Sequence, residues 1–503
     1  MDQIFNINTF VTITIIILTT IYLLFKCSTR NFKHWEERDV PYAKPLPFVG
    51  NFLKILTFRI QMGHYLAELY NQFDVPYFGI FIFNIPHLIV KCPNLLKLIL
   101  VKDFQYFPDR TVVSDEKCDA LGSKFLFFVP NPEWKHSRSK MAPAFSTGKL
   151  KSMMVLMDNV AEDLKAYVRK NLHKESLEAK ELFAKFSTDI IASCAFGVDA
   201  YSFKSENAEF RSIGRLVFDK RPKRAIFQTF CFLWPSFIRM FRIPFFDPKF
   251  TNFMRKMFWE TFNERRKANY KRNDLIDLVI QLQEKSKPGE PYEFVGDRVV
   301  APAGQFFAAG FEAVSSIMAF TLYELSIQPD IQNKVRQEIK SVTSDHGKIT
   351  YEALKDMKYL EMIVYESLRK YPTLPFIDRI CIEDYKVPNS DFVIEKGTPV
   401  YIPVFGLHYD PKYFPEPEKY DPERFSDENK DSFPEYAFIP FGKGPRSCIG
   451  ARFGFLTSKL GLAHILSEFE IVKTTKTPVP MEYETKGFLI GSKRGLPIGF
   501  KEL

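Results

Sequence analysis

The sequence predicts a mainly α-helical protein with small β-sheets, preceded by an N-terminal transmembrane helix. Three observations lead to this prediction: an apolar run without charges near the start, apolar residues at three- and four-residue steps in most later segments, and only a few short β-rich stretches. The clearest helical stretches are residues 351–370 and 453–469. The clearest β-rich stretches are residues 77–90 and 398–404.

The chain carries no charge from residue 3 to residue 25, and such a run can cross a hydrocarbon core of roughly 30 Å as a helix. Asp2 precedes this run, whereas Lys26 and Arg30 follow it. By the positive-inside rule, this asymmetry places the N-terminus outside or in a lumen and the rest of the chain in the cytosol. A cleaved signal peptide, the alternative, would have basic residues before a shorter apolar core. We therefore predict a membrane anchor at residues 1–26.

Residues 27–50 begin with charged side chains and then hold three prolines between Pro41 and Pro47. Closely spaced prolines exclude a helix and favour a stiff, extended connector, which would set the angle between the body and the membrane. No second linker is visible after residue 50. Residues 51–503 are therefore predicted to form one catalytic domain.

The net charge of +9 is spread along the chain rather than clustered. Nucleic-acid binding would require a basic stripe, so this class is excluded. A diffuse positive excess suits an anionic membrane surface or an acidic partner protein. Seven scattered cysteines without a C-x-x-C pair indicate a reducing compartment rather than a disulfide framework.

Residues 227–246 combine eight aromatic side chains with Arg239, Arg242 and two prolines. A basic, aromatic-rich, amphipathic surface of this kind is typical of a shallow membrane contact. An ordinary buried helix pair is the alternative, and the sequence leaves both open.

The most specific pattern surrounds Cys448. Glycines at 442, 444 and 450 allow a tight loop with inward-facing backbone amides, and a predicted helix follows the cysteine directly. The positive end of that helix favours a thiolate. A thiolate is an electron-rich ligand for haem iron and favours O–O cleavage. An isolated cysteine would more often be a small buried hydrophobe, but the surrounding pattern favours the ligand.

With Phe441, Gly444, Arg446, Cys448 and Gly450, the sequence matches every position of F-x-x-G-x-R-x-C-x-G. It thereby resembles the cytochrome P-450 superfamily, over essentially the whole chain, and is most similar to insect microsomal members that metabolise xenobiotics. The resemblance implies a fold with α-rich and β-rich regions around a buried haem b, with Cys448 as the axial ligand of the iron and Phe441, Arg446 and Gly450 in the cofactor-binding loop.

The resemblance also implies an oxidoreductase that inserts one oxygen atom from O2 into lipophilic xenobiotics or endogenous hydrophobic compounds. Its electrons would come from NADPH through NADPH–cytochrome P-450 reductase, with cytochrome b5 as a further candidate donor. The enzyme would lie in the endoplasmic reticulum membrane, with its catalytic domain facing the cytosol. Three lysines beside the haem motifs are candidates for the docking surface: Lys135, Lys140 and Lys443.

Glu366 and Arg369 form an E-x-x-R pair on one face of the helix predicted at 351–370. In the family, this pair and a later arginine, here Arg424, form a buried network that locks the haem-binding loop region. The resemblance further assigns the haem propionates to Trp134, Arg138, Arg379 and Arg446, because arginine is the natural counter-ion of a carboxylate. Solvated or capping arginines are the alternative for Arg138 and Arg379.

The oxygen-binding helix departs from the family pattern A-G-x-D/E-T-T/S. Ala309, Gly310 and Glu312 match it, whereas position 313 is Ala instead of Thr. The small residues would let dioxygen and substrate approach the helix, and Glu312 would feed protons. Ser316, roughly on the same face as position 313, could act only through a water molecule.

Two functions therefore compete. The first is a monooxygenase whose proton relay uses water, Glu312 or a substrate hydroxyl, and the rest of the chain favours it. The second is a member that rearranges peroxides or other oxidised substrates without O2 or a reductase. A haem-binding protein without catalysis is a further alternative. By the family's layout, the pocket lining would come from residues 107–128, 306–313, 375–377 and 488–490.

Overall fold

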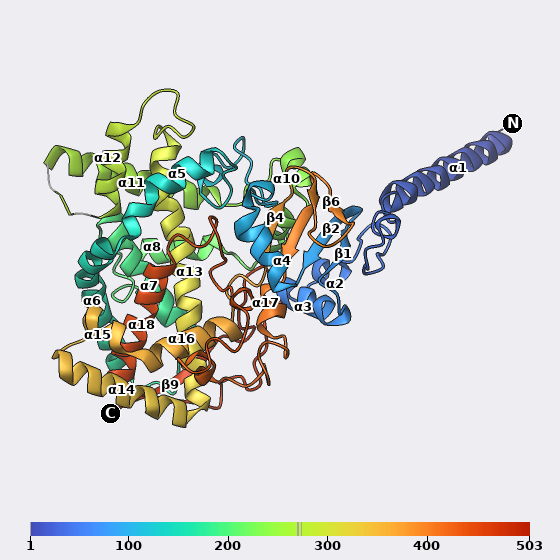
Figure 1. Ribbon diagram of the computed structural model, residues 1–503. Helices are drawn as coiled ribbons and strands as arrows, with labels where there is room; N and C mark the ends of the chain where they lie inside the picture. Colours follow the sequence, from blue (N-terminus) through green and yellow to red (C-terminus); the bar gives the residue numbers. More distant parts are fainter. Residues whose placement is uncertain (1, 269–270, 273) are drawn as a thin grey trace.

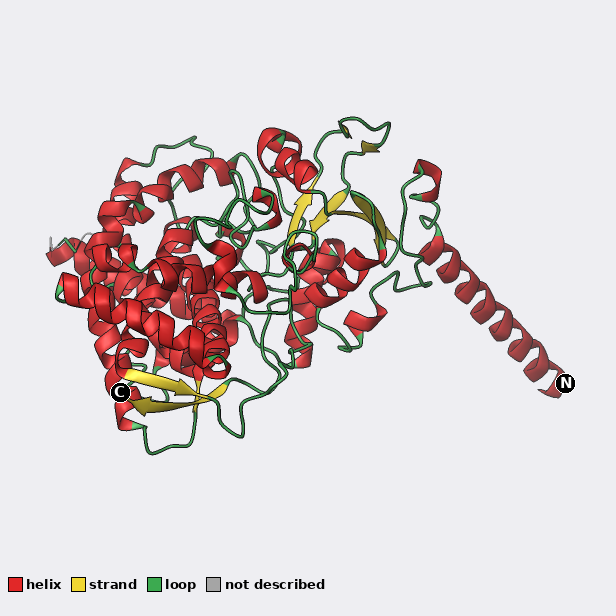
Figure 2. Ribbon diagram, turned by 60° about the horizontal axis from the view of Figure 1, so that its bottom comes forward, coloured by secondary structure: helices red, strands yellow, loops and turns green. Residues whose placement is uncertain are grey.

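A computed structural model describes residues 2–268, 271–272 and 274–503. Helices dominate the body; one group of strands lies on the side from which the N-terminal helix projects, and another lies near the C-terminus, as Figures 1 and 2 show. The prediction of a mainly α-helical fold with small sheets is confirmed. Helix α1 (Asp2–Thr29) projects from the side on which β1 and β2 lie (Figure 1).

The centre of the body is helix α13 (Asp297–Ile327), which packs against α7 (Ala179–Ile191), α11 (Pro248–Ala268) and α18 (Ala451–Glu468). It is apolar on nearly all sides, and a helix of this kind is stable only when it is buried. The other longer helices are α3 (Met62–Gln72), α5 (Glu133–Met141), α6 (Thr147–Lys170), α8 (Glu209–Val217), α9 (Pro222–Leu233), α10 (Pro235–Phe241), α12 (Leu275–Lys285), α14 (Pro329–His346), α15 (Tyr351–Asp356) and α16 (Lys358–Lys370). The short helices are α2 (Leu53–Leu56), α4 (Pro93–Lys97) and α17 (Val404–His408).

The largest sheet has the strand order β1-β2-β7-β4. Strand β2 pairs antiparallel with β1 and parallel with β7, and β7 pairs antiparallel with β4. Both β-rich stretches of the sequence lie in this sheet, which confirms them as strands. The strands of the three sheets are β1 (Tyr77–Ile82), β2 (Ile85–Val90), β4 (Ile377–Ile380) and β7 (Pro399–Ile402); β3 (Leu177–Glu178), β8 (Phe469–Val472) and β9 (Pro497–Glu502); and β5 (Tyr385–Lys386) and β6 (Val393–Ile394).

The single helix predicted at 351–370 is wrong in one respect: it is broken at Met357 between α15 and α16. The buried ammonium of Lys459, on α18, donates a hydrogen bond of 2.9 Å to the Met357 carbonyl. The same carbonyl still accepts from the Glu361 amide of α16, while the amides of Tyr359 and Leu360 donate to the Glu338 carboxylate on α14. Groups distant in sequence thus bind the backbone at the break. Helical periodicity continues across it and therefore does not reveal it. The helix predicted at 453–469 is confirmed as α18.

The proline-rich stretch is attached to β1. The Trp35 indole is 1% exposed and donates to the Ile80 carbonyl, and the backbones of Pro41 and Ala43 both hydrogen-bond to Gly79. A Cβ at Gly79 would lie 2.4 Å from the Trp35 ring, so only glycine lets the strand pass beneath the indole. Part of the predicted connector is thus fixed to the sheet, while the domain bounds at 26 and 50 stay predictions.

Candidate active site

The loop before α18 presents Cys448. Gly442 and Gly444 adopt φ values of +69° and +75°, and the Cys448 amide donates to the Phe441 carbonyl at 2.8 Å. A Cβ at Gly444 would lie 1.9 Å from the Leu100 carbonyl oxygen, so this loop can approach its neighbour only with glycine there. Gly450 is the N-cap of α18. The predicted loop-to-helix geometry around the cysteine is therefore present.

Cys448 is accessible although the residues around it form a compact loop. Burial among protein atoms raises the pKa of its thiol, and the Gly450 backbone together with Arg138 and Arg110 offsets only part of this increase. A coordinating metal ion removes the thiol proton outright. Iron bound at Cys448 would therefore hold the sulfur as the thiolate.

A cluster of arginines lies beside this loop. Arg446 is 6% exposed, stacks on the Trp134 ring at 4.3 Å and donates to the Val129 carbonyl at 2.9 Å. Its guanidinium also forms an ion pair of 3.0 Å with Asp109. Burial, assisted by the charge of Arg110, lowers the pKa of Arg446 to about 9. The lowered pKa indicates that the protein does not fully balance the positive charge of the buried Arg446 guanidinium.

Arg379, on β4, is 1% exposed and has an Nε without a hydrogen-bond partner among the described residues. Burial and then the charge of Arg110 hold its pKa well below the ordinary range. The carboxylate of Asp378 accepts bonds from Arg110 at 2.8 Å and from the Thr111 amide at 2.7 Å. Buried donors are normally satisfied. Arg379 Nη1 donates to the Asp378 carbonyl, but the free Nε and the neighbouring arginines fit a bound carboxylate, and a haem propionate is such a group.

Trp134 and Arg138 share a face of α5, as their spacing predicts. The Arg138 guanidinium lies 5.8 Å from the Trp134 ring, and burial lowers its pKa while the charge of Cys448 raises it. Trp134 thus contacts both Arg138 and Arg446, and the charges of Arg138 and Arg110 act on Cys448. Arg110 belongs to the same cluster, but the sequence motifs did not assign it. The Phe-Pro-Asp-Arg stretch that ends at Arg110 was the available signal.

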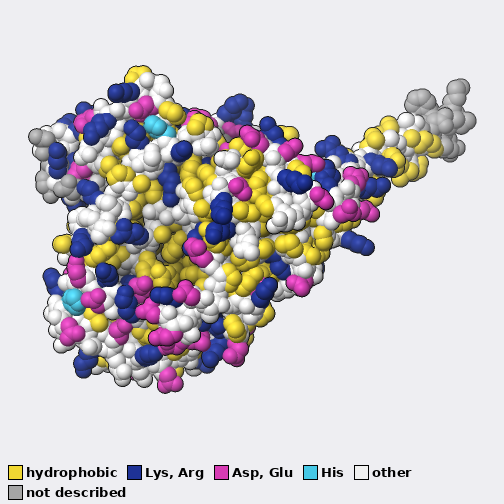
Figure 3. Space-filling model, in the orientation of Figure 1, with side chains coloured by type: hydrophobic (Ala, Val, Ile, Leu, Met, Phe, Trp, Pro, Cys, Tyr) yellow, Lys and Arg dark blue, Asp and Glu magenta, His cyan; other side chains and the backbone are white. Residues whose placement is uncertain are grey.

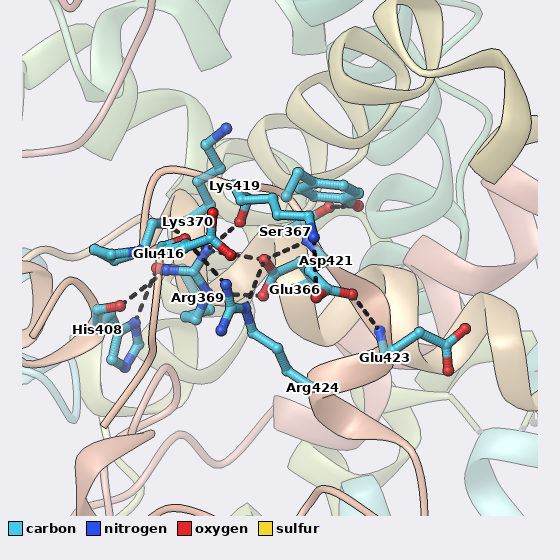
Figure 4. Close-up of polar contacts among 12 residues, drawn as sticks. Glu366, Ser367, Arg369, Lys370, His408, Glu416, Lys419, Asp421, Glu423 and Arg424 are labelled. Carbon is cyan, nitrogen blue, oxygen red and sulfur yellow. Dashed lines mark hydrogen bonds and ion pairs between the residues drawn. The ribbon is translucent and has the colours of Figure 1, made fainter. Parts of the chain in front are cut away.

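Glu366, Arg369 and Arg424 meet as predicted (Figure 4). Both side chains of the E-x-x-R pair are fully buried, with two hydrogen bonds of 2.7 and 2.8 Å between guanidinium and carboxylate. Arg424 Nε lies 3.6 Å from the same carboxylate. Arg369 also donates to the carbonyls of His408 and Pro417. The ion pair therefore holds the irregular segment that leads to the cysteine loop.

On α13, Glu312 forms an ion pair of 3.1 Å with Lys180 from α7. The same ammonium donates to the Glu312 carbonyl at 3.0 Å and to the Ser315 hydroxyl. Burial lowers the pKa of Lys180, and the charge of Glu312 opposes this effect. Ser315 is thus engaged by Lys180, and Ser316 is 3% exposed.

The two small residues before Glu312 have different surroundings. Ala309 is exposed although Ala308 is buried. A Cβ at Gly310 would instead lie 2.8 Å from the Ile191 side chain, so this glycine allows α7 and α13 to pack closely. Access for a small ligand is therefore available at Ala309, whereas Gly310 has a clear packing role.

Residues 40–497 match the family description "Cytochrome P450". The chain is 41% identical to "Cytochrome P450 6k1" of Blattella germanica over 97% of its length and 96% of that relative. It is 39% identical to "Probable cytochrome P450 6g2" of Drosophila melanogaster over 96% of its length and 97% of that relative. The chain belongs to the cytochrome P-450 family. It is accordingly a monooxygenase of the oxidoreductase class, and the family implies a haem cofactor.

In this cytochrome P-450, a small cleft of about 30 Å³ borders Glu312. Its other walls include Phe218, Lys220, Lys486 and Phe488. This volume exceeds the roughly 10–15 Å³ that a cavity needs to hold one water molecule. The cleft can therefore bring a water molecule to the only acidic side chain of the oxygen-binding motif.

Aromatic side chains from distant segments meet near this cleft. Phe232 lies 4.8 Å from Phe488 and 5.4 Å from Phe376, and Phe245 lies 4.9 Å from Phe128. We call Phe128, Phe232, Phe245, Phe376 and Phe488 the aromatic cluster. Three of the segments predicted to line the pocket contribute to it. Phe232 and Phe245 were not predicted there.

Two other predicted lining residues have different neighbours. Phe107 packs against Tyr385 at 5.1 Å, in the core around the largest sheet. Phe306 contacts Phe145 and Phe453, the latter on α18. Of the lysines predicted to dock a partner, Lys140 lies 3.7 Å from Glu290 and Lys443 lies 2.9 Å from Glu435.

Proposed function

We propose that this cytochrome P-450 inserts one oxygen atom from O2 into lipophilic xenobiotics or endogenous hydrophobic compounds, with electrons from NADPH through a membrane-bound reductase. The proposal depends on one observation: Arg110, Arg379 and Arg446 lie together beside Cys448. The arginines fit the propionates of a haem b, and the cysteine fits its iron. When bound, haem supplies the redox chemistry of dioxygen. Cys448 would ligate the iron, while Arg138, Arg379 and Arg446 would hold the propionates.

The aromatic cluster supports a lipophilic substrate. Burial of apolar surface provides about 25 cal/mol per Å² without identifying the ligand, and aromatic walls suit apolar ligands of varied shape. The substrate's reacting carbon would then be placed by packing against Phe128, Phe376 and Phe488, rather than by directional polar contacts.

The test combines the purified protein, NADPH, the reductase and a lipophilic probe under isotopically labelled dioxygen. We expect one labelled oxygen atom per product molecule and NADPH consumption that depends on the probe. Product formation from a hydroperoxide without NADPH or the reductase, and none with them, would instead support the peroxide-rearranging alternative. Haem binding without either reaction would indicate a non-catalytic protein.

For proton supply, we propose that Glu312 takes protons from water in its cleft, since Ala313 offers no hydroxyl. Lys180 would keep the carboxylate oriented between proton transfers, because its ammonium contacts both the side chain and the backbone of Glu312. Ser315 is held by Lys180, so it is a poor substitute for the missing threonine.

Ala313→Thr is expected to improve coupling. A hydroxyl at 313 would add a second proton donor, and positioned donors contribute about 10²-fold or more to proton-transfer steps. The hydrogen peroxide formed per product should therefore fall by about twofold or more relative to the natural protein. Ala313→Val is the matched control, because valine has nearly the shape of threonine and no hydroxyl. Equal peroxide release from the natural protein and the Thr variant would contradict the relay proposed here.

We also propose that α1 anchors the protein in the endoplasmic reticulum membrane, with the body in the cytosol. Residues Thr9–Thr29 have a mean hydropathy of 2.1, and none of the most apolar stretch is buried. Many hydrophobic side chains lie on the surface of the coloured part of the projecting helix in Figure 3. Helix α13 is also long and apolar enough to span a membrane, but 72% of it is buried in the body.

A second membrane contact is proposed at the end of α10. Most aromatics of 227–246 are partly or fully buried, as in the helix-pair alternative, but Met240 and Phe241 are 68% and 58% exposed. The β1–β2 turn lies between the start of α10 and the end of α1, since Phe83 lies 4.3 Å from Trp234 and Asn84 donates to the Cys27 carbonyl. The shallow contact is thus restricted to α10, beside Arg239 and Arg242.

Flotation with anionic vesicles tests this contact in protein that lacks residues 1–26. Replacing both Met240 and Phe241 with Ser is expected to weaken binding by about tenfold or more, because burying one large apolar side chain contributes about 1.5–3 kcal/mol. Val155→Ser is the control, since Val155 is 68% exposed on α6. An unchanged affinity in the double variant would remove α10 from the membrane surface.

A further inference from the structure

His408, at the end of α17, forms two hydrogen bonds with Arg369 of the buried ion pair. Arg369 Nη1 donates to the His408 carbonyl at 2.9 Å, and the His408 ring shares a hydrogen bond of 3.2 Å with the Arg369 carbonyl. Each side chain thus binds the other residue's backbone. His408 is 0% exposed, and its ring packs 5.2 Å from Phe438. This pair of contacts fixes the imidazole plane relative to α16.

The other ring nitrogen of His408 reaches the segment before Cys448. The Ile439 amide donates to His408 Nε2 at 3.1 Å. The Ile439 carbonyl then accepts from the Gly442 amide, and the Phe441 carbonyl accepts from the Cys448 amide. Hydrogen bonds therefore run from the Glu366–Arg369 pair through the imidazole and into the cysteine loop.

These partners permit one protonation state. A backbone carbonyl can only accept, so Nδ1 carries the proton; a backbone amide can only donate, so Nε2 presents a lone pair. Burial, then the charge of Arg369, lowers the pKa of His408 to about 3. The ring therefore stays neutral at physiological pH and keeps both bonds.

We propose that His408 is a positioning residue for Cys448, which transmits the rigidity of the Glu366–Arg369 network to the thiolate loop through its bond with the Ile439 amide. The proposal rests on the proposed function, because the consequence of a misplaced loop is loss of thiolate ligation. It concerns a residue that touches neither the substrate nor the cysteine itself.

Amide hydrogen exchange of the natural protein tests the bond directly. The Ile439 amide should exchange far more slowly than amides of exposed turns, since its only assigned partner is a buried nitrogen. Exchange as fast as in exposed turns would overturn the proposal. This measurement does not depend on turnover, so it is informative even if the proposed function fails.

Two variants distinguish the hydrogen bond made by Nδ1 of His408 from the one made by Nε2. In His408→Gln, the side-chain oxygen can accept from Ile439, as Nε2 does. In His408→Asn, the side-chain nitrogen can donate to the Arg369 carbonyl, as Nδ1–H does, but the acceptor for Ile439 is lost. A lost hydrogen bond corresponds to about tenfold in an equilibrium, so Ile439 exchange should accelerate about tenfold in Asn relative to Gln.

Absorbance of the reduced, carbon monoxide-bound protein gives the second readout. The ratio of thiolate-ligated to thiol-type absorption should fall about tenfold in His408→Asn and change little in His408→Gln. His87→Asn is the control, because His87 is a buried histidine that hydrogen-bonds to Ile85 on β2, away from the cysteine loop. Its spectrum should match that of the natural protein.

Equal exchange and equal spectra for His408→Gln and His408→Asn would overturn the proposal, because only the acceptor toward Ile439 should matter to the loop. Should either variant fail to fold, the exchange rate of the Ile439 amide in the natural protein tests the proposal: slow exchange supports it, and exchange as fast as in exposed turns overturns it. If the natural protein itself lacks the thiolate-type absorption, the proposed function fails instead, and this result is distinct from any difference between the variants.

Discussion

Cys448→Ala is expected to abolish both the thiolate-type absorption and the NADPH-dependent oxidation. The sulfur is the only atom of this loop that can ligate iron, whereas the loop's backbone bonds, such as that between the Cys448 amide and Phe441, do not need it. The variant should therefore fold and lose only its chemistry. Absorbance of the reduced, carbon monoxide-bound protein and turnover of a lipophilic probe measure the two losses.

Cys194→Ala is the matched control, because Cys194 is 0% exposed and lies within the core near α7. Removing that sulfur creates a small cavity and should cost about 1 kcal/mol without changing the spectrum. Retention of pigment and turnover in Cys448→Ala would contradict the assignment of the iron ligand and, with it, the arrangement of the arginines around the haem.

Arg369→Leu is expected to destabilise the fold by about 3–5 kcal/mol, because it leaves the buried Glu366 carboxylate with only the more distant Arg424, at 3.6 Å, as a cation. It also removes the donor to the carbonyls of His408 and Pro417, so the segment that leads to Cys448 loosens. Urea-induced unfolding, followed by intrinsic fluorescence, measures the loss.

The double variant Glu366→Leu with Arg369→Leu separates charge from packing. It should be less destabilised than the sum of the single variants, because neither the Glu366 carboxylate nor the Arg369 guanidinium is then left buried without the other. Lys54→Met is the control: the Lys54–Glu68 pair is 2.8 Å long, but its side chains are 55% and 42% exposed. Exposed pairs contribute about 0–1 kcal/mol. A loss for Arg369→Leu no larger than that for Lys54→Met would contradict a structural role for the network.

Much of the site is predictable because short motifs encode local geometry. The glycines around Cys448 and the three-residue spacing of Glu366 and Arg369 act within one loop or one helix turn. Arg110 was missed because its part in the cluster depends on Asp378 from β4, which is remote in sequence. Phe232 and Phe245 were missed for the same reason, since they resemble surface aromatics until Phe376 and Phe488 pack against them.

The sequence by itself determined the apolar N-terminal helix, the loop-to-helix presentation of Cys448 and the face shared by Trp134 and Arg138, because periodicity and glycine placement act over a few residues. Only the tertiary structure decided that Lys180 engages Glu312, that Lys459 binds the Met357 carbonyl between two helices and that His408 reaches Ile439. These contacts join segments far apart in the chain. Each pairs a buried polar group with a hydrogen-bond or ion-pair partner that lies near it only in the folded protein.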